Sequence, residues 1–213
     1  MTDTEAPRER RWDWREVAVV GLLSVTTILT AWVGFQSSKW GGAMSISFSQ
    51  ASTARLEAAR FEGVANRKIS VQSSLFAQWV QATGSQNAPV ADFLRERFPE
   101  PLATAFDAWV AQDPLTNPDA PLSPFDMPEY AIPELARSAA SDARADARFA
   151  EALVDNQRGD NYTVLTVAFA SVLFFTAMSE RMRSPRGRYA LLGLGVFLFV
   201  VSTTLLLTFP KLV

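Results

Sequence analysis

The chain has 213 residues, with 20 Lys and Arg against 22 Asp and Glu, and it contains neither Cys nor His. Without Cys there are no disulfides, thiolate metal ligands or cysteine nucleophiles, and without His the commonest general base and metal ligand is missing. The sequence also contains no Gly-rich phosphate loop, nucleophile elbow or metal-ligand cluster, and we expect a protein that is not an enzyme and has no metal, no cofactor, no nucleic acid partner and no evident small-molecule substrate.

Three apolar runs dominate the sequence, at residues 17–35, 162–178 and 189–209, and none of them contains Asp, Glu, Lys or Arg. Each is close to the roughly 20 residues that a helix needs to cross the hydrocarbon core of a bilayer. The first run is longer than the roughly 7 to 15 residues of a signal-peptide core, and no A-x-A site follows it, so we expect it to be retained. The sequence predicts an all-α membrane protein with three transmembrane helices.

Basic residues predict the orientation of these helices. Arginines gather in the N-terminal segment 1–16 and in the loop 179–188, and the positive-inside rule places both in the cytoplasm. The segment 36–161 carries 11 Lys and Arg against 16 Asp and Glu, a formal balance of 11 − 16 = −5, and is predicted to be extracytoplasmic, as is the tail 210–213. We expect a bacterial inner or plasma membrane. The predicted aromatic anchors are Trp12, Trp14 and Tyr189 at the inner boundary, and Trp40 and Tyr162 at the outer boundary.

A stripe of apolar residues at alternating spacings of three and four predicts a long amphipathic helix over about 43–82. Its mean spacing of 3.5 residues suits packing in a helical bundle or a left-handed coiled coil. Gly41 and Gly42 lower the helix propensity just outside the bilayer, which favours a bend there. The larger residues of this predicted seam are Phe48, Phe61, Ile69, Phe76 and Trp79.

The middle of the segment is less regular. Two short helices are predicted within about 89–112, each with Pro near its first turn and with Phe or Trp on one face. Closely spaced prolines disfavour helix and internal strand over 113–133 and predict an extended strap. Its residues Phe125, Met127, Tyr130 and Ile132 suit docking on the helical pair, and an exposed Pro-rich ligand for another protein is the alternative.

A return helix is predicted over about 134–161. Alanines dominate one of its faces, so a partner helix can approach closely, and that face comprises Leu135, Ala139, Ala143, Ala147, Ala150 and Val154. The repeated Asp-Ala-Arg at 142–144 and 146–148 is interpreted as a solvated or helix-pairing surface, with binding of a cation or basic partner as the alternative.

Ser and Thr are frequent in all three spans, where their hydroxyls can bond preceding carbonyls or neighbouring helices. The alternative is a hydroxyl-lined pore built by several subunits, with Asp155, Asp160 and Asn161 at its outer mouth. No Asp, Glu, Lys or Arg lies inside the spans, which disfavours a transporter or pump that works through charge.

Together these elements predict three transmembrane helices with a helical extracytoplasmic hairpin or bundle between the first and second. Over roughly residues 11–183 this architecture resembles the sensory half of bacterial chemoreceptors and sensor kinases, but only about ten cytoplasmic residues follow where those proteins have a signalling domain. We expect a non-catalytic structural or accessory subunit, as a homo-oligomer or within a larger membrane complex. A small oligomeric ion channel and an extracytoplasmic sensor or adaptor acting on another membrane protein are the alternatives.

Overall fold

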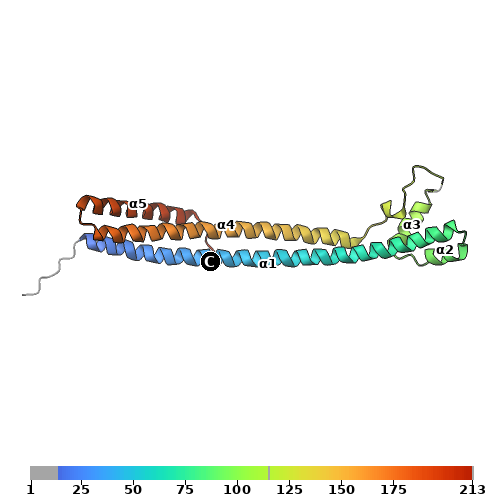
Figure 1. The fold of residues 1–213 in the computed structure, drawn as a ribbon, viewed down its shortest axis with the longest axis horizontal. Coiled ribbons are helices and arrows are strands. Elements are labelled where there is room, and N and C mark those ends of the chain that lie inside the picture. The colour runs from blue at the N-terminus through green and yellow to red at the C-terminus, as the bar shows by residue number, and fades with distance from the viewer. Residues whose placement is uncertain (1–13, 115, 213) are drawn as a thin grey trace, which may run out of the picture. The chain divides into compact units, whose positions relative to one another are not determined.

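The computed structural model describes residues 14–114 and 116–212, and this part of the chain is helical and contains no strand. The elements in chain order are α1 (Trp14–Gly84), α2 (Ala88–Arg95), α3 (Leu102–Val110), the single 3₁₀ turn η1 (Pro124–Asp126), α4 (Pro133–Arg181) and α5 (Pro185–Thr208) (Figure 1). Three helices, α1, α4 and α5, each contain a stretch long and apolar enough to cross a membrane. The predicted anchor Trp12 lies outside the described residues.

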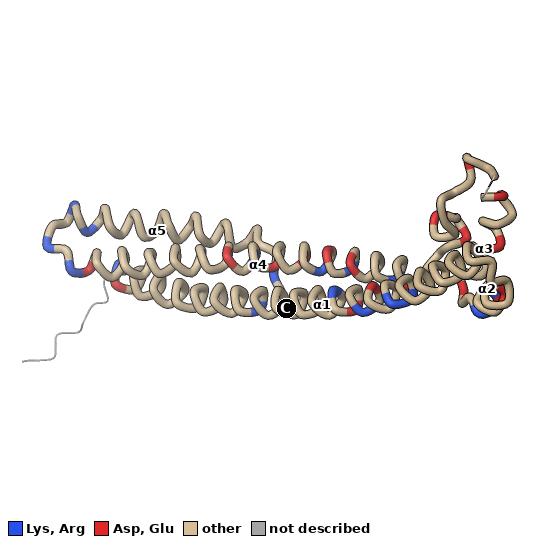
Figure 2. Tube along the Cα trace, turned by 45° about the vertical axis from the view of Figure 1, so that its right-hand side comes forward, with Lys and Arg blue, Asp and Glu red and all other residues tan. Residues whose placement is uncertain are grey.

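The first predicted span and the predicted long helix form one continuous helix, α1, of 71 residues. The predicted return helix and the second span likewise join in α4, of 49 residues. Neither Gly41 nor Gly42 ends α1, because a glycine costs a helix only about 1 kcal/mol relative to alanine. The link between α4 and α5 is short, and arginines lie in it and in the adjoining ends of both helices (Figure 2): Arg181, Arg183, Arg186 and Arg188.

The chain divides into two compact units. Unit 1 contains the described residues up to Phe48 and those from Ala150 onward, and unit 2 is Ser49–Phe149. Unit 1 therefore holds α5 with one part each of α1 and α4. Unit 2 holds the remaining parts of α1 and α4 together with α2, α3 and η1.

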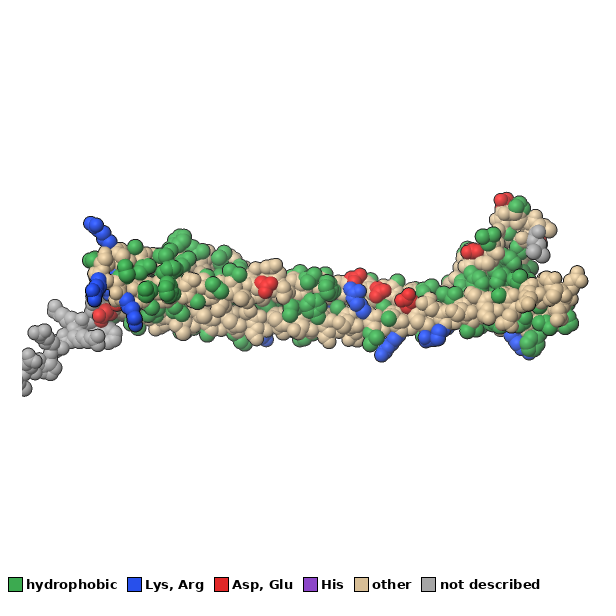
Figure 3. All heavy atoms as spheres, in the orientation of Figure 1, with side chains coloured by type: hydrophobic (Ala, Val, Ile, Leu, Met, Phe, Trp, Pro, Cys, Tyr) green, Lys and Arg blue, Asp and Glu red, His purple; other side chains and the backbone are tan. Residues whose placement is uncertain are grey.

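The core of unit 1 takes side chains from three helices: Val33 and Trp40 of α1, Tyr162, Leu165 and Phe169 of α4, and Leu206 of α5. Helix α5 runs beside α4 (Figure 1), and Gly195 allows a close approach, since a Cβ there would lie 2.9 Å from Thr176 Oγ1. Only 17–33% of the most apolar windows of the three helices is buried. The outer surface of unit 1 is consequently apolar, and arginines gather at its end near the α4–α5 link (Figure 3).

Buried polar groups also hold unit 1 together. The Gln36 side chain is fully buried, and its amide donates to the Leu212 carbonyl (3.1 Å) and accepts from the Leu212 N–H (3.0 Å). The Tyr162 hydroxyl donates to the Pro210 carbonyl (2.9 Å). The segment after α5 is thereby bonded to both α1 and α4.

In unit 2 the centre of the α1 seam is made of small residues. Ala51, Ala58, Ala65 and Gln72 are buried at intervals of seven residues, and the larger predicted seam residues Phe61, Ile69, Phe76 and Trp79 are half-buried beside them. Phe48, in unit 1, is half-buried as well. The Ser138 hydroxyl of α4 donates to the Ala58 carbonyl (3.0 Å), a contact that requires close approach of the two backbones.

Helix α4 uses a different face from the alanine-rich one. Its buried residues in unit 2 are Ser138, Ser141 and Ala145, whereas the alanine-rich set from Leu135 to Val154 is exposed throughout. At about 100° per residue, the two sets lie on nearly opposite sides of the helix. Ion pairs between described residues line the α1–α4 contact, among them Arg55–Asp146, Glu57–Arg144 and Lys68–Glu134.

Candidate functional site

The most distinctive surface of unit 2 is an aromatic assembly that we call the head, residues 84–133, with the end of α1 packed against it. Phe106 of α3 is almost completely buried, and its ring lies edge-on to Trp79 (4.7 Å between centroids) and to Phe98 (5.2 Å). Phe76 of α1 meets Trp109 edge-on at 5.7 Å. Offset and edge-to-face packing of this kind adds to the burial of apolar area, so the head has a rigid aromatic centre.

The strap is ordered because its side chains pack against this centre. Met127 is buried in the same cluster as Phe106, and Phe125 lies edge-on to both Phe76 (5.6 Å) and Tyr130 (4.9 Å). The Trp109 indole N–H donates to the Pro121 carbonyl (2.8 Å). Burial raises the pKa of the Tyr130 phenol. These contacts do not leave the strap as a free Pro-rich ligand.

A polar contact joins α1 to the loop before α3. The Gln72 amide donates to the Glu100 carbonyl (3.1 Å), and the Glu100 carboxylate accepts from the Thr104 hydroxyl (2.9 Å). Gln72 is 2% exposed, and its Oε1 atom has no partner among the described residues. The contact fixes the start of α3 relative to α1. Both helices contribute residues to the hollow that is described in the next paragraph.

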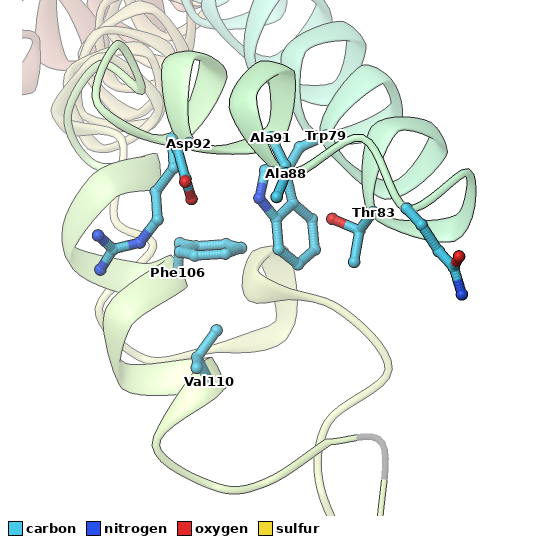
Figure 4. A pocket seen from close by; sticks show the side chains of 9 residues that line it. Trp79, Thr83, Ala88, Ala91, Asp92, Phe106 and Val110 are labelled. Atoms are coloured by element: carbon cyan, nitrogen blue, oxygen red, sulfur yellow. The ribbon is translucent and has the colours of Figure 1, made fainter.

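A hollow of about 480 Å³ opens between the end of α1, α2 and α3 (Figure 4). Trp79 and Phe106 supply aromatic walls, and the small side chains of Ala88 and Ala91 on α2 leave the space open. The remaining lining residues are Thr83, Gln86, Asp92, Arg95 and Val110. A second, more apolar hollow of about 1050 Å³ shares Trp79, Thr83 and Val110 and is bordered by Phe76, Trp109 and Leu122.

The head is strongly acidic. It contains two basic residues, Arg95 and Arg97, against eight Asp and Glu, a formal balance of 2 − 8 = −6. Within the first hollow, the Arg95 guanidinium is paired with Asp107 of α3, which is not a lining residue. No hydrogen bond or ion pair within the described chain engages the Asp92 carboxylate. The uncompensated charge of the hollow is therefore negative.

The predicted pore-mouth residues do not form one cluster. Asp155 is 6% exposed and accepts from Arg158 (3.1 Å), whose guanidinium lies 4.6 Å from the centre of the Trp40 ring. Asp160 and Asn161 are exposed and accept from Asn156 and Gln157 one turn earlier on α4. Asp155 and Asp160 lie on different sides of α4, so they do not face a common space within one chain.

Two predicted interfacial anchors are core residues instead. Trp40 is 5% exposed and Tyr162 is fully buried, because both fill the space where the helices of unit 1 meet. Trp14 and Tyr189 are exposed, and the Tyr189 hydroxyl accepts from Arg15 (3.1 Å). Trp40 and Tyr162 therefore pack against protein, and their predicted location at the outer boundary of the membrane stays a prediction.

The sequence indicated the aromatic residues of the head but not the hollows. Phe93, Phe98, Phe106 and Trp109 were readable as one apolar face of two short helices, and of these Phe93 is 53% exposed. The hollow depends on Ala88 and Ala91 lying opposite Trp79. Small residues on a short helix give only a weak sequence signal for a hollow. Nothing in the sequence around Asp92 indicates that it lines one.

The head presents groups that are suited to binding a ligand. No group of three or more Asp or Glu residues in the described ranges is arranged to hold a metal ion. The hollow combines aromatic rings, one free carboxylate, a hydroxyl and an amide, which are recognition groups. Comparison with protein-family models, with curated proteins and with solved structures finds no match.

Proposed function

We propose that this chain is a non-catalytic membrane subunit that assembles with copies of itself or with another membrane protein through its extracytoplasmic helices. The apolar stretches of α1, α4 and α5 anchor it in a bilayer. The basic α4–α5 link lies in the cytoplasm by the positive-inside rule, and the residues of unit 2 are then extracytoplasmic. Unit 2 forms a helical hairpin of α1 and α4 that carries the head.

The observation that carries this proposal is the exposed alanine-rich face of α4. Within unit 2 it presents Leu135, Ala139, Ala143 and Ala147 on the side opposite to the α1 contact. Alanine lets a second helix approach closely, and the 44% exposed Leu135 adds apolar area. A helix already packed on one face gains nothing from a second uncharged face unless another element covers it.

Cysteine cross-linking tests this directly, because the chain contains no native cysteine. We expect Ala143→Cys and Ala147→Cys to form disulfide-linked dimers of the membrane-inserted protein under mild oxidation. Ala59→Cys, an exposed alanine on α1, is the matched control and should remain monomeric. Equal cross-linking at all three positions, or none at Ala143 and Ala147 alongside a monomeric mass in mild detergent and no co-purifying protein, contradicts the proposal.

The hollow of the head favours a second candidate, an extracytoplasmic sensor or adaptor that acts on another membrane protein. Its volume lies within the range of roughly 300–1,000 Å³ typical of ligand sites. Ligand-dependent cross-linking of the α4 face would support this candidate. Cross-linking that no ligand changes supports the purely structural role.

The hydroxyls of the spans favour packing over conduction. Thr26, Thr30, Thr166, Ser171 and Thr204 each donate to the carbonyl one turn before them. Hydroxyls bonded in this way are satisfied without lining a pore. The channel alternative therefore has no specific contact in its favour. Absence of conductance in planar bilayers is the expected result.

A further inference from the structure

We propose that the hollow lined by Trp79 and Asp92 binds a small organic ammonium ion with an apolar body, such as an arylalkylamine. The site belongs to unit 2 alone and uses α1, α2 and α3. It goes beyond the assembly role proposed above. The cross-linking test concerns the α4 face, so either proposal can fail without the other.

The shape of the hollow suits one flat or branched apolar group. Trp79 and Phe106 stand edge-to-face with their planes at 79° (Figure 4), and because Phe106 is only 1% exposed, the half-buried Trp79 offers the ring surface that a ligand can reach. Ala91 is buried and Ala88 is exposed at the opening, and both side chains are too short to fill the space. Aromatic and methyl surfaces of this kind favour an apolar ligand body.

The charges around the hollow select a cation. Arg95 is the lining cation, and Asp107 already neutralises it. Asp92 leaves one carboxylate without a partner, and the surrounding head carries a formal balance of −6. The Arg95 guanidinium lies 5.7 Å from the centre of the Phe106 ring, so Trp79 is the ring left to attract an ammonium group, and the Asp92 carboxylate can accept its N–H in a charge-assisted bond. An anion would meet repulsion from Asp92 and from the field of the head.

Polar lining atoms complete the recognition of an ammonium group. The Thr83 hydroxyl and the Gln86 amide oxygen are both acceptors, and Gln86 is held in a left-handed backbone conformation with φ of 57° just before α2. Asp92 and Thr83 lie on opposite sides of the Trp79 ring (Figure 4), so the carboxylate receives the ammonium group and the hydroxyl is an acceptor for a polar group at the other end of the ligand. A neutral alcohol of the same shape offers only one donor.

Isothermal titration calorimetry on the full chain in detergent tests the proposal with three probes of matched shape. The probes are 2-phenylethylamine, 2-phenylethanol and 3-phenylpropionate, which are respectively cationic, neutral and anionic at neutral pH. We expect the amine to bind at least about fivefold more tightly than the alcohol and the anion to bind most weakly. Raising the salt concentration should narrow the difference, because exposed charges are screened.

Two variants and a control locate the effect. Asp92→Asn should abolish the preference for the amine, and Ala88→Phe should fill the hollow and abolish binding of all three probes. Glu129→Gln removes the same charge from an exposed position outside the lining and should leave the preference intact. The proposal is overturned by equal binding of amine and alcohol, by a preference for 3-phenylpropionate, or by equal effects of Asp92→Asn and Glu129→Gln.

Discussion

Helices α1 and α4 meet in both units, but the two contacts are built from different residues. In unit 1 the space between the helices is filled by large side chains, including Trp40, Tyr162 and Phe169. In unit 2 the same pair of helices meets through alanines and serines, with ion pairs along the margins. Large apolar groups of unit 2 are concentrated in the head instead.

The difference follows from the solvent of each part. With unit 1 in lipid, as proposed, apolar burial between helices gives little driving force, so close packing and satisfied hydrogen bonds must hold them. The bonds of Gln36 and Tyr162 to the segment after α5 are of this kind. With unit 2 in water, as also proposed, burial of the head aromatics supplies the driving force, and the α1–α4 contact needs only to fix the helix pair.

The largest effect is expected from Phe106→Ala. Truncating a fully buried Phe removes about 3–5 kcal/mol of stability, and this ring contacts Trp79, Phe98 and Trp109. Denaturant titration followed by tryptophan fluorescence should show early unfolding of the head. Phe93→Ala, at an exposed position on α2, is the matched control and should change stability little.

The loss of stability in Phe106→Ala should be confined to unit 2. Unit 1 has its own core, so the circular dichroism of the membrane helices should persist in Phe106→Ala under conditions where the head has unfolded. Simultaneous loss of both signals would show that the two units unfold as one.

Two glycines of unit 1 provide a sharper test of its close packing. At Gly195 a Cβ would lie 2.9 Å from Thr176 Oγ1, whereas at Gly159 the nearest atoms would be 3.7 Å away. Gly195→Ala should therefore destabilise the α4–α5 contact by about 1–3 kcal/mol, and Gly159→Ala should be tolerated. Thermal unfolding in detergent measures both.

A second substitution tests whether a steric clash causes the loss of stability in Gly195→Ala. Thr176 Oγ1 is buried without a hydrogen-bond partner in the described chain, so its removal sacrifices no bond. Thr176→Ala should restore the stability of Gly195→Ala. A double variant no more stable than Gly195→Ala alone would show that the clash is not the cause.

Two fully buried glutamines on α1 compare hydrogen bonding in the two units. Gln36 has both amide atoms bonded to Leu212, whereas Gln72 makes one bond, to Glu100. Replacement by Met keeps the shape and removes the bonds. We expect Gln36→Met to lose about 1–2 kcal/mol and Gln72→Met about half as much, by chemical denaturation with a probe in each unit. A larger loss of stability for Gln72→Met than for Gln36→Met would contradict the view that buried hydrogen bonds matter more in unit 1 than in unit 2.

Much of the helical architecture was readable from the sequence. Uncharged runs and three-and-four spacing predicted the apolar stretches of α1, α4 and α5 and the half-buried positions of Phe61 and Phe76. These signals are local to one helix and depend only on its period. The predicted extracytoplasmic location and the oligomer stay predictions.

What the sequence did not supply depends on contacts between distant segments. The alanine face of α4 looked like its packing face, yet Ser138 and Ser141 lie against α1, because periodicity alone does not say which of two small-residue faces meets the partner. Trp40 has the amphipathic side chain that is typical of an interfacial anchor, and only the position of α4 shows that it is buried. The bond of Gln36 to a residue 176 positions away has no local signal.

The smallest expected effect concerns pH and the Lys68–Glu134 pair of unit 2. The hydrogen bond from Lys68 and the backbone N–H of Glu134 lower the pKa of this carboxyl in the folded chain. Such a group stabilises the fold at pH above its unfolded pKa, and the contribution is lost as the pH falls through the folded pKa. Glu134→Gln should therefore unfold at a lower temperature than the parent at neutral pH, and the unfolding temperatures of the two proteins should converge in acid.

The Lys68→Met variant should show the same loss of stability at neutral pH, and the double variant should lose no more, because one shared interaction is lost in each case. Additive losses would show that the two residues act separately and that their ion pair does not stabilise the α1–α4 contact of unit 2.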